Sequence, residues 1–210
     1  VEITSTDPGF PRDAAAWCNS TGNQLISKEA TGGKSVVVIE KGEPKSCNIV
    51  TSCEGKGKTF IMFSDDLDKA LATFVLANGA AATGQKVTIF FTFWGLNVIK
   101  KLHKPNVEKD IFGKMFGMML PSSSRKLKLS KMSMGGIGGK MMRYIMNRKG
   151  IDSLESLRQQ ALENGVEFIA CQMSMDVMGV KQEELLDEVT IGGVATYMER
   201  ADNANINLFI

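Results

Sequence analysis

The stretch that decides the fold is KTFIMFSDDLDKALATFVLANGAAATGQKVTIFFTF, at residues 58–93. It begins with a continuous apolar run at 58–64, which is typical of a strand buried on both faces. Acidic residues then open an amphipathic helix and Gly84 closes it, because carboxylates suit the beginning of a helix and glycine suits its end. A second buried strand follows at 86–93. The order strand, helix, strand predicts a parallel pairing of the two strands.

The same alternation continues to the end of the chain. After an insertion at about 104–137, helices are expected at 139–150, 153–165 and 193–204, and strands at 166–171, 187–191 and 206–210. We therefore predict an α/β domain over 58–210, with a mostly parallel five-stranded sheet covered by helices on both faces.

The beginning of the chain has a different pattern. Residues 1–43 read as a strand, a helix and two further strands, a small α+β (βαββ) unit whose core is thin and which looks like half of a domain. Residues 44–57 are polar and rich in Gly and Lys, and they are interpreted as a linker.

The composition is that of an ordinary globular protein, with 43% hydrophobic and 23% charged residues. Its charge is uneven, since residues 100–150 hold 13 Lys and Arg against only Glu108 and Asp110. The most apolar window, at 87–99, is 13 residues long, whereas a membrane span needs about 20. The first residues do not look like a signal peptide and the four cysteines read as reduced thiols, so we expect a cytoplasmic protein.

Cys171 ends the apolar run of FIACQMSMDVMG, residues 168–179, and two interpretations are open. It is a buried core thiol, as free cysteines often are, or a nucleophile at a strand end beside the amides of a following turn or helix. Met173 and Ser174 in that turn are candidates for lining its pocket. A cysteine protease is disfavoured because the only histidine, His103, lies in a lysine-rich segment expected to be a solvated helix end.

Four further residues are expected at the edge of the sheet that carries Cys171, because the carboxyl ends of parallel strands meet there. Asp65 and Asp66 read either as paired carboxylates for acid–base chemistry or as caps of the following helix. Phe93 and Trp94 either wall a pocket or continue the core. Asp65 and Trp94 are therefore pocket candidates as well.

The segment after the second strand contains two patterns. MGGIGGK at 134–140 lacks the glycine and the Ser or Thr that a phosphate-binding loop requires at Met134 and Met141, so a turn before a helix is favoured over an anion-binding nest. Residues 111–149 combine the basic excess with eight of the 13 Met residues. This predicts a surface that binds an acidic protein or a membrane, with packing inside an oligomer as the alternative. Nucleic acid is disfavoured, because aromatic residues are few and no reading motif is present.

The remaining cysteines give no metal site. Cys47 and Cys53 stand in the linker without the second tight pair that structural zinc usually has, and Cys18 reads as packing in a helix. We expect no metal and no cofactor.

Two long stretches, 58–101 and 126–180, resemble the DsrE/DsrF-like family, in particular its DsrE2 branch, and the resemblance covers about 56–210. It implies a flavodoxin-like sheet, a homo-oligomer such as a trimer or hexamer, and intracellular sulfur trafficking. The family's active cysteine accepts sulfane sulfur as a persulfide, and by position that role falls on Cys171. Residues 5–29 are similar to the second half of a TusA-type sulfur-carrier domain. The Cys-Pro-x-Pro motif of such domains is absent and Cys18 does not stand in one, so no carrier function is transferred to residues 1–43.

Three functional hypotheses follow. The first is a sulfur relay, a sulfurtransferase in which Cys171 carries a persulfide between donor and acceptor proteins. This relay requires a partly exposed Cys171 thiol. The second is a non-catalytic oligomerisation or docking module of a larger sulfur-metabolism or disulfide-reductase polypeptide, with Cys171 buried. The third is an accessory domain that helps a flavin disulfide reductase to handle disulfide or polysulfide.

Overall fold

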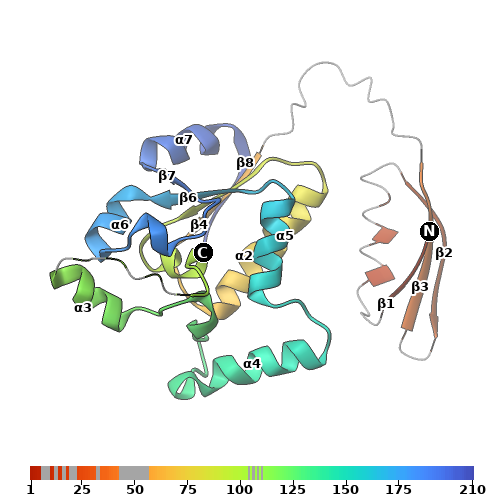
Figure 1. Cartoon of the computed structure of the whole chain (residues 1–210). Helices are drawn as coiled ribbons and strands as arrows, with labels where there is room; N and C mark the ends of the chain where they lie inside the picture. Colours follow the sequence, from red (N-terminus) through yellow and green to blue (C-terminus); the bar gives the residue numbers. More distant parts are fainter. Residues whose placement is uncertain are drawn as a thin grey trace. The chain divides into compact units, whose positions relative to one another are not determined.

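The chain folds as two compact units, Val1–Cys53 and Glu54–Ile210, in a computed structural model (Figure 1). The predicted linker lies almost wholly outside the described residues. These are 1–5, 10–11, 14–15, 18, 23–31, 34–42, 57–103, 105, 107, 109 and 111–210, with the backbone alone described at 31, 111, 112 and 114.

The smaller unit is built on a three-stranded antiparallel sheet. Its strands are β1 (Glu2–Ser5), β2 (Gln24–Thr31) and β3 (Lys34–Glu40), in the order β1-β3-β2. The side chains of β3 alternate between buried and less buried, and Val37 and Ile39 pack with Ala14 and Cys18 of the helical segment. The predicted packing role of Cys18 is therefore confirmed.

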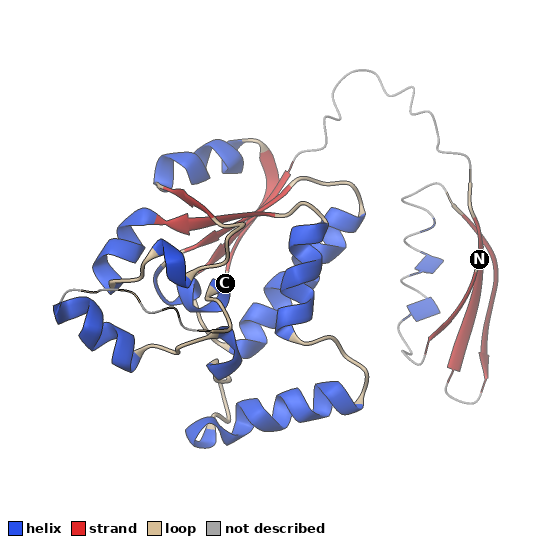
Figure 2. Ribbon diagram, in the orientation of Figure 1, coloured by secondary structure: helices blue, strands red, loops and turns tan. Residues whose placement is uncertain are grey.

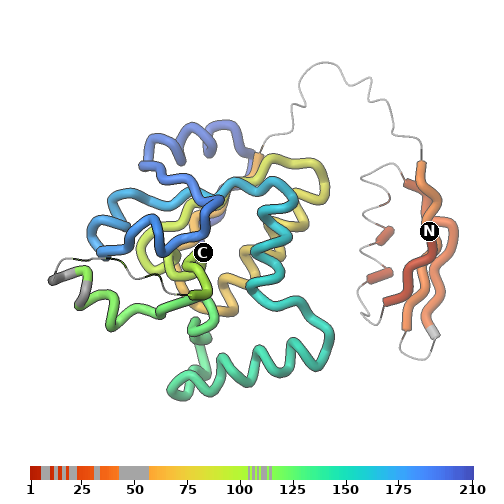
Figure 3. Tube along the Cα trace, in the orientation of Figure 1, coloured from red at the N-terminus to blue at the C-terminus, as the bar shows by residue number. Residues whose placement is uncertain are grey.

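The larger unit contains the predicted five-stranded sheet, and every pair of neighbouring strands in it is parallel. The strands are β4 (Gly57–Met62), β5 (Val87–Phe91), β6 (Glu167–Cys171), β7 (Thr190–Gly192) and β8 (Ala204–Phe209). Their order is β7-β6-β5-β4-β8, so the trace in Figure 3 returns at its end to lie beside the first strand of the unit. If the five strands of this sheet are numbered 1 to 5 from β4 to β8, their order in the sheet is 4-3-2-1-5, whereas the strand order of flavodoxin itself is 2-1-3-4-5.

The four helices predicted for the larger unit are present, and the structure describes two more there. The α-helices are α2 (Leu67–Ala82), α3 (Ile111–Met119), α4 (Ile137–Arg148), α5 (Leu154–Glu163), α6 (Gln172–Met178) and α7 (Val194–Asp202). Short 3-10 helices are η1 (Phe93–Ile99), η2 (Ser124–Lys126), η3 (Met134–Gly136) and η4 (Gln182–Glu184). Ser153 caps α5 as predicted, since its hydroxyl accepts a hydrogen bond from the Ser156 amide at 3.1 Å. Helix α3 was not predicted, because it lies in the insertion, and for the segment of α6 the sequence left a turn or a helix open.

Helices cover both faces of the sheet, which confirms the predicted α/β class (Figure 2). On one face Phe91 and Phe168 pack against Phe74 of α2, and α5 lies beside α2. On the other face Phe90 packs against Tyr197 of α7. The physical reason is that crossovers between parallel strands are right-handed. The last crossover, from β7 to β8, runs across the sheet in the opposite direction to the earlier ones, so its helix falls on the opposite face.

None of the helices that the structure describes combines the length and the apolar character needed to cross a membrane.

Candidate functional site

Cys171 is the last residue of β6 and directly precedes α6, so its predicted place at a strand end is confirmed. Strand β6 lies between β5 and β7, and Phe168 to Cys171 are all buried. Ligands and chemistry in parallel sheets gather at the carboxyl ends of the strands. This edge of the sheet is therefore the candidate functional site.

The thiol itself is covered. Side chains alternate along a strand, so Cys171 and Ile169 lie on the face that α7 covers, in one apolar cluster with Phe90 and Tyr197. The Cys171 residue is only 2% exposed. The expectation of a partly exposed thiol is therefore wrong for this conformation, because the crossover helix α7 passes over this face of the sheet, a placement that strand patterning does not reveal.

A glycine lets α7 lie close to the strand that carries Cys171. Gly192 pairs with Cys171 in the sheet. A Cβ atom at Gly192 would lie 2.8 Å from Cγ2 of Ile169 and 3.3 Å from Cβ of Thr196 in α7. A side chain at position 192 would therefore clash with Ile169 of β6 and make a tight contact with Thr196 of α7.

Few contacts hold α7 in place over the thiol. Tyr197 is the buried side chain of this helix; its ring centroid lies 5.2 Å from that of Phe90, and its hydroxyl lies 3.3 Å from that of Thr59. Arg200 adds a surface ion pair with Glu167, whose carboxylate accepts bonds of 2.9 and 3.2 Å. The other side chains of α7 are half-buried or exposed. On the face of the sheet that carries the Cys171 side chain, α7 is thus a lightly packed helix.

Ser174 and Met173, predicted to line a pocket, have different positions. Ser174 is fully buried, and its hydroxyl lies 2.8 Å from that of Thr92, which follows β5. This hydrogen bond fixes α6 to the neighbouring strand end, so Ser174 positions the helix that begins beside Cys171. Met173 is 55% exposed, so it lies on the surface next to the site.

Asp65 belongs to a separate polar pair. Its carboxylate accepts a 3.0 Å hydrogen bond from Nδ2 of Asn97, and partial burial raises the pKa of Asp65 above its usual value despite that bond. Asn97 is fully buried, and its Oδ1 has no hydrogen-bond partner among the described residues. No hydrogen bond in the described part of the chain joins this pair to Cys171. The structure does not bring Asp65 into contact with the thiol.

The capping interpretation of the two aspartates is wrong in its detail. Asp66 stands at the N-cap position of α2, but its side chain makes no cap hydrogen bond. Its Oδ2 instead accepts from the Ser64 hydroxyl at 2.8 Å and lies 2.8 Å from Nζ of Lys69. The carboxylate is oriented towards these two side chains rather than the helix amides.

Trp94 is one of several aromatic residues at the same edge of the sheet, and it is 43% exposed. Phe93 before it has a positive φ of 47°, a conformation that costs a bulky residue about 1–3 kcal/mol. The ring of Phe63 lies 5.5 Å from that of Phe93 and 5.6 Å from that of Phe209, which is 67% exposed. Sequence reasoning missed Phe63 and Phe209, although both fall at the ends of predicted strands.

The other sequence candidates lie elsewhere. His103 is exposed at a bend rather than at a helix end, and Cys18 is buried in the smaller unit. Cys47 and Cys53 lie outside the described residues. Where side chains are described, no three His, Cys, Asp or Glu residues are grouped so as to hold a metal ion.

The glycine-rich run forms the turn that was predicted. Met134, Gly135 and Gly136 have positive φ angles of 42°, 69° and 98°, and α4 begins at the next residue. Gly138 is needed for packing, because a Cβ atom there would lie 2.1 Å from the carbonyl oxygen of Met132. The run therefore directs the chain into α4.

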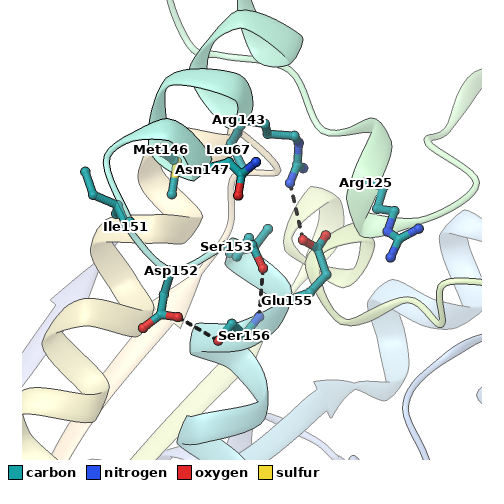
Figure 4. A pocket seen from close by; sticks show the side chains of 12 residues that line it. Leu67, Arg125, Arg143, Met146, Asn147, Ile151, Asp152, Ser153, Glu155 and Ser156 are labelled. Carbon is teal, nitrogen blue, oxygen red and sulfur yellow. Dashed lines mark hydrogen bonds and ion pairs between the residues drawn. The ribbon is translucent and has the colours of Figure 1, made fainter.

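A cavity of about 690 Å³ lies between the end of α4 and the beginning of α5 (Figure 4). Arg143 crosses it to Glu155 at 3.3 Å and donates a 2.9 Å bond to the carbonyl of Ser124. Asp152 accepts from the Ser156 hydroxyl at its other side. None of the predicted site residues lines this cavity, so it is separate from the strand end with Cys171.

Comparison with protein families gives a match to the DsrE/DsrF/DrsH-like family over residues 55–209. The chain belongs to this family. The match covers all but the first and last residues of the larger unit and confirms the family resemblance drawn from the sequence, whereas the TusA-like character of residues 1–43 stays a prediction.

Two curated relatives match nearly over their full lengths. The protein YrkE of Bacillus subtilis (strain 168) is 44% identical over 155 residues, which are 74% of this chain and 97% of that protein. "Sulfur carrier protein DsrE2" of Allochromatium vinosum is 38% identical over 161 residues, 75% of this chain and 99% of that protein. Among solved structures, the YchN protein of Escherichia coli aligns with a TM-score of 0.42 at 10% identity, over 73% of this chain and 99% of that one.

Proposed function

We propose that this protein is an intracellular, cytoplasmic sulfur-trafficking protein that accepts sulfane sulfur as a persulfide on Cys171 and passes it to a partner protein. The observation that carries the proposal is the 38% identity, over 99% of its length, to a relative named as a sulfur carrier. Among the cysteines that the structure describes, Cys171 is the one at the carboxyl edge of the parallel sheet. A homo-oligomer, a trimer or a hexamer, is part of this proposal.

The transfer is two displacements at sulfur. The Cys171 thiolate attacks the outer sulfur of a donor persulfide R–S–SH; a bond forms between Sγ and that sulfur, the donor S–S bond breaks, and the donor leaves as the thiolate R–S⁻ with the bonding electron pair. An acceptor thiolate R′–S⁻ then attacks the same sulfur and becomes R′–S–SH, which restores the Cys171 thiolate. With thiosulfate as the donor the leaving group is sulfite. No oxidant or reductant is consumed.

The covered thiol adds one requirement. Because Cys171 is 2% exposed, a donor reaches it only when the site opens. The lightly packed helix α7 is the cover on the thiol's face of the sheet. A closed site also protects a persulfide from stray thiols and oxidants between the two transfers. We infer that partner docking and movement of α7 go together.

The test is the intact mass of the reduced full-length protein after exposure to polysulfide or thiosulfate. Wild type is expected to gain about 32 Da, one sulfur, in a form that dithiothreitol removes. Cys171→Ser is expected to gain none, and Cys18→Ser is the matched control with an equally buried cysteine and should behave as wild type. Equal gain by the wild type and Cys171→Ser, or no gain by either, would contradict the proposal.

A second candidate is favoured by the burial of Cys171. In it the domain is a non-catalytic oligomerisation or docking module of a larger polypeptide, and the thiol is a core residue. This candidate predicts that native Cys171 resists iodoacetamide until the whole domain unfolds. The relay predicts alkylation under native conditions, through opening of the site.

A further inference from the structure

Helix α4 has an apolar side that the domain does not cover. With 3.6 residues per turn, Ile137, Met141 and Tyr144 fall on one side of the helix, and they are 64%, 47% and 64% exposed. Ile145 beside them is 39% exposed. These four residues are called the outer face of α4.

The inner side of the same helix already satisfies the packing of the domain. Gly138, Gly139 and Met146 are buried there, and Met142 packs against the main core. Arg143 is held on this side by its ion pair with Glu155. The outer face therefore makes no contribution to the core of the single chain, and its apolar residues call for a binding partner.

The charge of the segment that contains the outer face is of one sign along the sequence. No Asp or Glu occurs from residue 111 to residue 151. Within the described part of this stretch, seven exposed cations make no ion pair with a described residue, and they are Arg125, Lys126, Lys128, Lys131, Lys140, Arg148 and Lys149. The partner of this surface must therefore be anionic.

We propose that the outer face of α4 docks on the surface of an anionic lipid bilayer. An interfacial helix combines an apolar side with Lys and Arg beside it, and it lies in the plane of the headgroups. Tyr144 has an apolar ring and a polar tip, which suits that depth, and the flexible side chain of Met141 adapts to lipid chains. Lys140 and Arg148 are placed to reach the phosphates.

Two other occupants fit less well. A second copy of this chain docked on the outer face about a two-fold axis would bring the cations of one α4 against those of the other, which is repulsive. In a complex with an acidic protein, individual charges of the two partners are arranged so that they fix the register of the interface. A stretch of 41 residues with nine cations and no acid offers no such arrangement, but it suits the uniform charge of a bilayer.

The test uses the full-length chain and co-sedimentation with two kinds of vesicle, one of phosphatidylcholine and one of phosphatidylcholine with phosphatidylglycerol. Binding is expected only to the anionic vesicles and should fall as salt is added. Each cation near the surface contributes about fivefold, so Lys140→Gln with Lys149→Gln should weaken binding about 25-fold. Ile137→Gln and Met141→Gln should each weaken it about tenfold through lost apolar contact.

The control variants are Lys86→Gln and Val75→Gln, which change exposed residues outside the basic segment and should leave binding unchanged. Circular dichroism verifies that each variant is folded. The proposal is overturned by no binding to anionic vesicles, by equal binding to neutral ones, or by no effect of the α4 variants. Two further outcomes overturn it when vesicles are not bound. If the α4 variants change the oligomer mass, the partner is a second copy of the chain. If they change the binding of poly-glutamate, the partner is an acidic protein.

Discussion

Tyr197 offers the most direct test of how Cys171 is covered. It is the buried side chain of α7, and it belongs to the same apolar cluster as Cys171. Replacing a buried aromatic residue with alanine costs about 3–5 kcal/mol. If about 3 kcal/mol of this is lost from the closed form of the site, the open form becomes on the order of 100-fold more populated, since about 1.4 kcal/mol is a factor of ten.

Tyr197→Phe is the graded comparison. It removes only the contact between the hydroxyls of Tyr197 and Thr59 at 3.3 Å, and Thr59 keeps its hydrogen bond to Asn207. The expected loss is at most about 1 kcal/mol, or about fivefold in the open population.

The assay is the rate of iodoacetamide alkylation at the Cys171 peptide under native conditions, measured by mass spectrometry. Where opening and closing are fast, this rate follows the population of the open site. We expect alkylation of Cys171 to be fastest in Tyr197→Ala, slower in Tyr197→Phe and slowest in the wild type. Met198→Ala, on the exposed side of α7, should match wild type.

Phe168→Leu separates opening of α7 from unfolding of the domain. Phe168 lies on the same strand as Cys171 but packs on the opposite face, against Phe74 and Phe91. The two variants are compared at the same loss of the free energy of unfolding, measured in urea. If Phe168→Leu then raises the alkylation rate as much as Tyr197→Ala does, the thiol is exposed by global unfolding and the reasoning about α7 is refuted.

Two further predictions concern the region between β4 and η1. Asp65→Asn should raise the free energy of unfolding near neutral pH. Burial raises the pKa of Asp65, so the wild type loses stability as the pH rises past the ordinary pKa of a carboxyl group and Asp65 ionises. The variant has no carboxyl group at this position and does not lose that stability. Urea unfolding at a series of pH values measures it, and an unchanged pH dependence would contradict the burial argument. Gly95→Ala should destabilise the domain by about 1–3 kcal/mol or more, since its Cβ would lie 1.9 Å from the carbonyl oxygen of Met62. Gly79→Ala within α2, where a Cβ meets nothing within 4 Å, should instead stabilise it by about 0.5–1 kcal/mol, and similar thermal shifts of the two variants would be the contrary result.

Much of the fold could be predicted because its elements are marked locally. The strand at Phe60 and Met62 and the strand at Ile89 and Phe91 are continuous apolar runs, since strands covered on both faces bury side chains of both orientations. The helix over 67–82 carries its own beginning and end signals. For α6 the sequence left a turn or a helix open, because seven residues give too short a window for a helical period to stand out from a turn.

The sequence alone determined the α/β class, the position of Cys171 at a strand end and the basic, Met-rich character of residues 111–149. Each of these depends on periodicity or composition within a short window of chain. Tertiary structure alone decided that Cys171 is buried beneath α7, that Asp65 pairs with Asn97 rather than with the thiol, and that the outer face of α4 is exposed. These features depend on contacts between residues far apart in the chain. The direction of the last crossover places α7 over Cys171, and the packing of the core decides which side of each helix is covered. Neither can be predicted from the pattern of residues within one segment.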